Sequence, residues 1–348
     1  KYDRRCCHLS TGEVQSKLAS GLPHTVRLKM PDDYRFSFQD EIRGLVEMDS
    51  SQSDDQVIIK SDGFPTYHLA AVADDHYMKI SHVIRGEEWL SSTPKHLWLY
   101  QCLGWEAPVW VHLPLILNPD RTKLSKRMND VSVDSYIEKG YLKEALLNFI
   151  ALLGWHTADD REIYSLEELC EEFSLNRVSK AGAVFDLTKL DWMNAHYLRS
   201  LPVETIVQRS GSFFSAAGLY AQSTEQMAKI ISIARERCAL LPDLVEYSKM
   251  FLEYNSLSAA DQEYLISPEA QRVVQWFTEQ LAGLDSIEKE ACAEIVQRGL
   301  AELAIKAKAY YTPLRLALIR TAHGPDLPSI IDILGVPETL NRLHKAQI

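Results

Sequence analysis

Two patterns of hydrophobic and polar positions divide the chain into an α/β part and a helical part. Short apolar or β-branched runs, which predict strands, occupy residues 26–30, 57–60, 82–85 and 109–117. Helices are expected at residues 67–73 and 93–103, the second with Thr93 as N-cap, Pro94 as its first residue and Gly104 as its end. Strand, helix and strand in this order are typical of a parallel sheet.

Beyond residue 131, strand patterns fade and amphipathic helices follow one another. Residues 142–153 keep their apolar side chains on one helical face, and Ser165 with Glu168 forms a candidate capping box. Residues 186–192 predict a short, bent helix. From residue 202 the chain is expected to be helical to its end, with breaks near residues 210–218, 241–242, 267–268 and 324–325.

Composition narrows the class of protein. With 348 residues, two or three domains are expected, and 46% hydrophobic residues exclude a disordered chain. No apolar stretch reaches the roughly 20 residues that a membrane span needs. A net charge of −11 argues against nucleic-acid binding over the whole surface but leaves room for a local basic face. Six cysteines without a C-x-x-C pair suggest reduced thiols in a reducing compartment.

A basic loop follows the apolar run at 109–117. Asn118-Pro119-Asp120 favours a turn, and Arg121 to Arg127 holds four cations in seven residues, with Ser125 between two lysines. The carboxyl ends of strands in open α/β sheets are where ligands bind. Lysine is a mobile point charge that suits a phosphate changing shape during reaction. A solvated charged turn is the alternative interpretation.

The order of motifs carries a resemblance to a known family. Lys123-Leu124-Ser125-Lys126-Arg127 resembles the K-[LIM]-S-K-R loop of class I aminoacyl-tRNA synthetases. Nearly the whole chain is similar to bacterial-type glutamyl-tRNA synthetases, through segments 62–70, 74–76, 82–89, 92–94, 140–148, 154–155, 185–194, 312–318 and 323–327. The resemblance implies the second half of a Rossmann-type catalytic domain, a helical stem-contact region and an α-helical anticodon-binding domain. Their expected bounds are residues 1–60 for the end of a connective insertion, then 61–130, 131–202 and 203–348.

The resemblance implies a glutamate–tRNA ligase. Such an enzyme activates glutamate with ATP and Mg²⁺ to glutamyl-adenylate and transfers it to the 3′ end of tRNA(Glu). A monomer without membrane contact is expected, in the bacterial cytoplasm or an organelle matrix. The alternatives are a non-catalytic tRNA-binding paralogue and a ligase that acts on another carrier. Charging of tRNA(Gln) as well stays open.

The resemblance also assigns site residues. Arg85, at a strand end, is expected to hold the glutamate side chain through a bidentate guanidinium, with an ion pair to Glu87 or Glu88 as the structural alternative. The other glutamate-binding positions are Tyr67, a hydrogen-bond donor, and Ala71, which replaces the Asn of some relatives and only lines the pocket. The catalytic residues are Lys123, Ser125 and Lys126, and the ATP-binding set is Lys123, Leu124, Ser125, Lys126, Arg127, Glu88 and Trp89. Lys126 is expected to contribute most.

A basic stretch near the end suits an anticodon loop. Residues 298–320 carry five cations against one Glu302, together with Tyr310 and Tyr311. Cations beside aromatic rings attract phosphates and stack on bases. The expected tRNA-binding residues are Lys306, Lys308, Arg315 and Arg320. A solvated helix face is the alternative.

One feature departs from the family pattern, and two candidate metal motifs are interpreted without a metal. None of the eleven histidines starts an H-x-G-H sequence, and the family's H-I-G-H motif precedes the region where this chain begins. A truncated protein, inactive alone, is therefore expected. Asp74-Asp75-His76 is interpreted as a polar helix end, because adjacent helical residues point apart. Cys6-x-His8 resembles half of a zinc site, and no metal is expected there because two ligands do not close a tetrahedral site.

Overall fold

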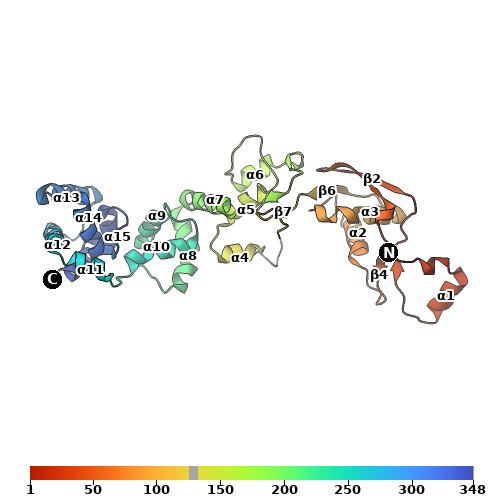
Figure 1. Ribbon diagram of the computed structural model, residues 1–348, viewed down its shortest axis with the longest axis horizontal. Coiled ribbons are helices and arrows are strands. Elements are labelled where there is room, and N and C mark those ends of the chain that lie inside the picture. Colours follow the sequence, from red (N-terminus) through yellow and green to blue (C-terminus); the bar gives the residue numbers. More distant parts are fainter. Residues whose placement is uncertain (125–131, 348) are drawn as a thin grey trace. The chain divides into compact units, whose positions relative to one another are not determined.

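The structure is a computed structural model that describes residues 1–124 and 132–347 (Figure 1). The described residues fall into two compact units. One lies within Lys1–Asn129 and Asn148–Asp186, and the other within Asp130–Leu147 and Leu187–Ile348. The first contains all described strands, and the second is helical. The predicted combination of an α/β part and an all-α part is confirmed.

A four-stranded mixed sheet forms the centre of the first unit, in the order β3 (Gly44–Asp49), β2 (Arg35–Asp40), β6 (Val109–Leu113) and β5 (His82–Gly86). β5 and β6 are parallel from the pair His82 and Val109 to the pair Gly86 and Leu113. Helix α3 (Thr93–Leu103) connects them and contacts α2 (Tyr67–Tyr77). The predicted strand–helix–strand unit is therefore confirmed.

The hairpin of β2 and β3 was not predicted. Its two strands are antiparallel and join the parallel pair through Asp40 on β2 and Trp110 on β6. Alternate residues of β2 are buried, and these are Phe36, Phe38 and the charged Asp40. A buried carboxylate at a core position weakens the apolar alternation by which strands are recognised.

Short strands complete the unit. β1 (Val26–Arg27) pairs with β4 (Val57–Ile59), and β7 (Ile116–Leu117) pairs with β8 (Ala183–Val184). The strand predicted over 109–117 is thus two strands. Pro114 lies between them and has no N–H to donate to a sheet. Helices α1 (Thr11–Ala19), α5 (Lys143–Ala151) and α6 (Leu166–Glu172) lie outside the sheet, and the capping box of Ser165 and Glu168 is confirmed.

The predicted N-cap of α3 is wrong. Ser92 precedes the helix in a helical conformation, and Thr93 is already its first residue. The reason is that residues Glu87–Ser92 form 3-10 turns that run directly into α3, so no extended cap residue exists. Gly104 ends the helix with φ 69°, as predicted. The Thr93 hydroxyl is consequently available for a contact elsewhere.

The second unit is helical as predicted, with one difference in helix length. Helix α7 (Leu187–Ser200) has 14 residues and is not short. Helix α8 (Val203–Ala216) ends inside the break expected near residues 210–218. The expected breaks at 241–242, 267–268 and 324–325 mark helix ends. The other helices are α4 (Val133–Glu138), α9 (Thr224–Ala234), α10 (Leu241–Leu252), α11 (Ala259–Leu265), α12 (Pro268–Leu281), α13 (Lys289–Leu303), α14 (Ala307–Ile319) and α15 (Leu327–Ala346). No described helix is long and apolar enough to cross a membrane.

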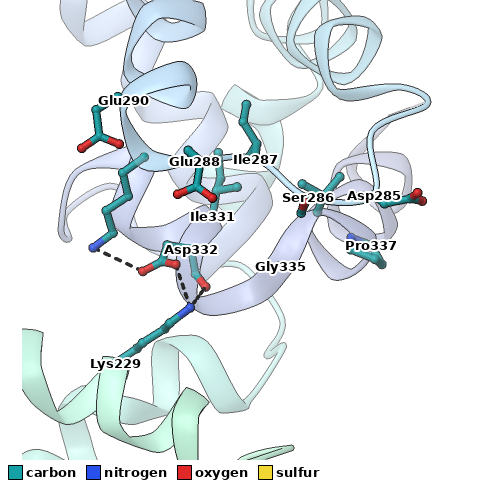
Figure 2. Close-up of a pocket in the computed structure, with 12 residues that line it drawn as sticks. Lys229, Asp285, Ser286, Ile287, Glu288, Glu290, Ile331, Asp332, Gly335 and Pro337 are labelled. Carbon is teal, nitrogen blue, oxygen red and sulfur yellow. Dashed lines mark hydrogen bonds and ion pairs between the residues drawn. The ribbon is translucent and has the colours of Figure 1, made fainter.

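One carboxylate joins three of these helices (Figure 2). Asp332 on α15 pairs with Lys229 on α9 at 2.8 Å and with Lys289 at the start of α13 at 3.2 Å. They border a hollow of about 510 Å³, beside Gly335, where α15 leaves helical geometry. The ammonium groups of Lys229 and Lys289 thus both have Asp332 as partner within the unit. We interpret the hollow as a gap where these three helices meet.

Candidate functional site

The Arg85 guanidinium, at the end of β5, is held by uncharged groups. Its Nε donates to His112 Nε2 at 3.0 Å, and its Nη2 donates to Thr93 Oγ1 at 2.8 Å. Its Nη1 lies 3.3 Å from His96 Nδ1, and its central carbon lies 5.0 Å from the centre of the Trp110 ring. The sheet and α3 together fix the plane of the guanidinium.

No described carboxylate forms an ion pair with Arg85, so the structural alternative of a pair with Glu87 or Glu88 is wrong. Glu87 pairs with Arg43 at 2.7 Å, and Glu88 pairs with Lys123 at 3.0 Å. The three neighbours of Arg85 take three of its five N–H bonds. Each terminal nitrogen makes one of these contacts, and Tyr67 also interacts with the guanidinium. A carboxylate in a bidentate pair takes one N–H from each terminal nitrogen.

The histidines around Arg85 are uncharged near neutral pH. Burial is the largest cause and lowers the pKa of His96 to about 3, helped by the nearby Arg85 charge. Burial also lowers the pKa values of His68 and His112. The neutral histidines add no positive charge beside the guanidinium. The Arg85 charge therefore remains the main charge of the site and favours binding of an anion.

Tyr67, Ala71 and Trp89 lie near this guanidinium. The Tyr67 ring is 5.0 Å from the Trp89 ring and 6.3 Å from the His96 ring, centre to centre. Tyr67 is 54% exposed. Burial lowers the pKa of Arg85, and the interaction with Tyr67 partly opposes this lowering. Ala71, one turn further along α2, is half-buried and presents only a methyl group. The structure thus brings an arginine, a phenol and an indole to one exposed place.

The described start of the basic loop lies at the same strand end. Asn118 to Thr122 form a turn closed by backbone hydrogen bonds, and Leu124 N–H donates to the Ile116 carbonyl at 3.0 Å. Lys123 then pairs with Glu88, which follows Arg85 by three residues. Ser125, Lys126 and Arg127 lie outside the described residues. The first loop lysine is therefore linked through Glu88 to the residues that directly follow β5.

Comparison with known proteins covers both units. The profile of tRNA synthetases class I (E and Q), catalytic domain, matches residues 1–192, and that of an anticodon binding domain matches residues 203–347. The glutamate–tRNA ligase of Alkaliphilus metalliredigens is 42% identical and that of Finegoldia magna 38%, each match covering 99% of this chain and 71% of the relative. The chain belongs to the glutamate–tRNA ligase family. Solved ligases of this family, from Elizabethkingia meningosepticum in complex with its amino acid and from Elizabethkingia anophelis, match at TM-scores of 0.89 and 0.86, with 36% and 35% identity. These two matches each cover 99% of this chain and 73% of the solved one.

The family match supports a catalytic protein over a binding paralogue. The catalytic-domain profile extends over Arg85, Tyr67 and the whole basic loop. A paralogue that had kept only tRNA binding has no need of a desolvated arginine without a carboxylate partner. The resemblance noted in the sequence is therefore confirmed at the level of family, fold and ligase class.

In the anticodon-binding region of this ligase family member, the expected RNA contacts differ in accessibility. Lys306 and Lys308, at the start of α14, are exposed. Arg315 is half-buried and donates to the Pro325 carbonyl at 3.2 Å, and Arg320 is half-buried with its guanidinium 3.6 Å above Tyr254. Tyr310 is fully buried, so its expected stacking on a base is wrong. Tyr310 is buried because its position on α14 faces the core of the helical unit.

The motifs considered for metals serve other contacts. The His76 ring stacks on Trp105 at 3.9 Å between ring centres and packs the end of α2. Cys6 and His8 are exposed in a short 3-10 turn. Within residues 1–124 and 132–347, no group of three or more His, Cys, Asp or Glu side chains is arranged to hold a metal ion.

Acid should destabilise the first unit, partly through His96. Unfolded, this histidine has an ordinary pKa near 6.5, and folded its pKa is about 3. Between these values the unfolded state binds the extra proton, so the free energy of unfolding falls as the pH falls. The expected loss from pH 7.5 to pH 5.5 is about 1.4 kcal/mol. Urea denaturation at both pH values should show a smaller loss for His96→Gln, and equal losses would contradict the assignment.

The sequence did not reveal the groups that hold Arg85. Asp40, His96 and His112 come from β2, α3 and β6, and none lies in a motif that carries the resemblance. Thr93 lies in one of these motifs, at 92–94, but its residue type predicted a helix cap. A polar residue inside an otherwise apolar run is the available signal, as with His112 after Trp110 and Val111. Such a residue is expected to be buried and hydrogen-bonded, but the sequence does not show which residue it bonds to.

Proposed function

We propose that this chain, as a glutamate–tRNA ligase, joins glutamate to the terminal adenosine of tRNA(Glu). The observation that carries the proposal is the Arg85 guanidinium, which is desolvated, contacts only uncharged side chains and has no described carboxylate partner. The carboxylate of a glutamate side chain completes this set. The ion pair of Lys123 with Glu88, three residues after Arg85, supports a nucleotide site next to the glutamate site.

The remaining contacts to glutamate follow from what surrounds Arg85. Tyr67 donates its phenolic hydrogen to the amino acid, and its exposed position leaves this hydrogen accessible. Ala71 lines the pocket without a polar contact. Since Arg85 takes the side-chain carboxylate, the α-carboxylate is left free to react.

ATP binds beside glutamate, through the basic loop and the residues after β5. The proposed set is Glu88, Trp89, Lys123, Leu124, Ser125, Lys126 and Arg127, and Mg²⁺ enters with the nucleotide. The glutamate α-carboxylate attacks the α-phosphate, pyrophosphate leaves, and the loop lysines stabilise the charge that develops on the phosphate oxygens. Lys123 and Lys126, with Ser125 fixing the loop, are the proposed catalytic residues.

The tRNA lies along both units. Residues 1–60 are assigned to the end of a connective insertion, 61–130 to the catalytic fold, 131–202 to stem contacts and 203–348 to anticodon binding. Lys306 and Lys308 are exposed cations for phosphates, and Arg315 and Arg320 are the proposed contacts further along α14. The protein works as a monomer in the cytoplasm.

Aminoacylation by the complete gene product tests the proposal. Radiolabelled glutamate should be transferred to tRNA(Glu) in an ATP-dependent reaction, because the site combines a carboxylate receptor with a phosphate-binding loop. Parallel reactions with tRNA(Gln) define the tRNA specificity. Binding of tRNA(Glu) without ATP consumption would contradict the ligase proposal and favour a binding paralogue.

A further inference from the structure

A buried chain of hydrogen bonds links Arg85 to a carboxylate on another strand. His112 on β6 accepts from Arg85 Nε at its Nε2, and its Nδ1 lies 2.6 Å from Asp40 Oδ2. The side chains of His112 and Asp40 are both fully buried. Three neighbouring strands, β2, β6 and β5, therefore contribute one residue each to a continuous line of polar contacts.

Asp40 is itself rigidly anchored. Its Oδ1 accepts the backbone N–H of Ile42 at 3.0 Å and of Arg43 at 2.8 Å, in the turn between β2 and β3. Burial raises the pKa of Asp40, but these bonds together with the His112 contact outweigh it, and the pKa is lowered overall. An ionised carboxylate only accepts hydrogen bonds.

The acceptor character of Asp40 decides where the proton of His112 lies. A neutral imidazole carries one proton, and the short contact with Asp40 places it on Nδ1. The lone pair of Nε2 is then directed to the Nε–H of Arg85. The Thr93 hydroxyl, 3.3 Å from Nε2, is a second donor to the same atom. With the proton on Nε2 instead, two N–H groups would oppose each other at 3.0 Å.

We propose that Asp40, acting through His112, is a positioning residue that orients the Arg85 guanidinium for the carboxylate of the amino acid. This inference rests on the proposed role of Arg85 in glutamate binding. Neither Asp40 nor His112 touches the ligand. Their effect is to engage the Nε side of the guanidinium, so that its terminal nitrogens face the pocket in one orientation.

A matched pair of substitutions at His112 separates the two hydrogen bonds. In His112→Gln the amide oxygen reaches the place of Nε2 and still accepts from Arg85. In His112→Asn the shorter amide still donates to Asp40 but does not reach Arg85. We expect the KM for glutamate to rise at least tenfold in His112→Asn, and to stay within about threefold of the natural protein in His112→Gln.

Asp40→Asn tests the proton position. The asparagine oxygen still accepts from Ile42 and Arg43, but its NH₂ group donates to His112 Nδ1 and moves the imidazole proton to Nε2. An asparagine in place of such an aspartate acts in this way beside a catalytic histidine in serine proteases. The KM for glutamate should rise at least tenfold, while kcat and the KM for ATP change less than about threefold.

A spectroscopic readout makes the test independent of activity. In protein with ¹⁵N-labelled histidine, the His112 resonances, identified by their loss in His112→Gln, should show a protonated Nδ1 in the natural protein and a protonated Nε2 in Asp40→Asn. Thermal unfolding identifies any variant that fails to fold, and the other variants then decide. The inference is overturned if His112→Asn and Asp40→Asn keep the natural KM, or if His112→Gln is as impaired as His112→Asn. Failure of the proposed function is distinct, because Arg85→Gln would then keep the natural KM while the tautomer exchange remained.

Discussion

Replacement of Arg85 by glutamine should raise the KM for glutamate by between about 30-fold and several-thousand-fold. Truncating one partner of a buried, hydrogen-bonded charge pair costs about 2–5 kcal/mol, and each 1.4 kcal/mol is a factor of ten. Glutamine removes the charge and leaves the substrate carboxylate without its two donors. Steady-state aminoacylation with varied glutamate measures the effect, and the KM for ATP should change far less.

Arg85→Lys should not restore binding. Lysine keeps the charge, but its single ammonium cannot fill the planar positions against His112, Thr93 and His96 and also receive a carboxylate in bidentate fashion. The matched control is Arg35→Gln on β2, whose side chain is exposed and forms only a 3.9 Å contact with Glu47. A natural glutamate KM in Arg85→Gln would remove the observation on which the proposed function rests.

In the full-length enzyme, Lys126→Ala should lower the rate of glutamyl-adenylate formation by about 100- to 1,000-fold. Loss of one preorganised donor to charge that develops in a transition state has an effect of this size. Lys123→Ala should be milder, because Glu88 already neutralises part of the Lys123 charge. Glutamate-dependent ATP–pyrophosphate exchange, measured with tRNA present, reports on this step directly.

A control lysine is available in α1. Lys17 is exposed, and α1 has no buried residues, so Lys17→Ala should leave the exchange rate unchanged. If Lys126→Ala retained near-natural exchange, the basic loop would have no catalytic role, whatever its resemblance to the family motif. A larger effect at Lys123 than at Lys126 would instead reverse the proposed order of the two lysines.

Local sequence patterns were sufficient to predict the β5–β6 strand pair, the end of α3 and the helical second unit. The apolar run at 82–85, the helix ended by Gly104 and the run from residue 109 gave the parallel pair β5 and β6. Arg85 and Lys123 were found because each lies in a motif beside a strand end. The helical second unit followed from its periodicity.

Contacts between distant segments were not available from local patterns. Asp40 and His112 are 72 residues apart, and their pairing depends on β2 lying next to β6. Thr93 was assigned to the helix cap because its residue type favours that position, but the preceding 3-10 turns left its hydroxyl to Arg85. Tyr310 lies in a basic stretch, yet its helical face is the buried one.

The junction at Asp332 has a consequence for how salt affects RNA affinity. A lysine that binds a phosphate releases counterions, and this release makes affinity fall with ionic strength. Lys229 and Lys289 already face a carboxylate in the folded protein, so they are not available to neutralise phosphates and displace the counterions of the RNA. If the exposed Lys306 and Lys308 bind tRNA as proposed, we expect tRNA affinity to fall less steeply with salt concentration than the lysine content of the helical unit suggests.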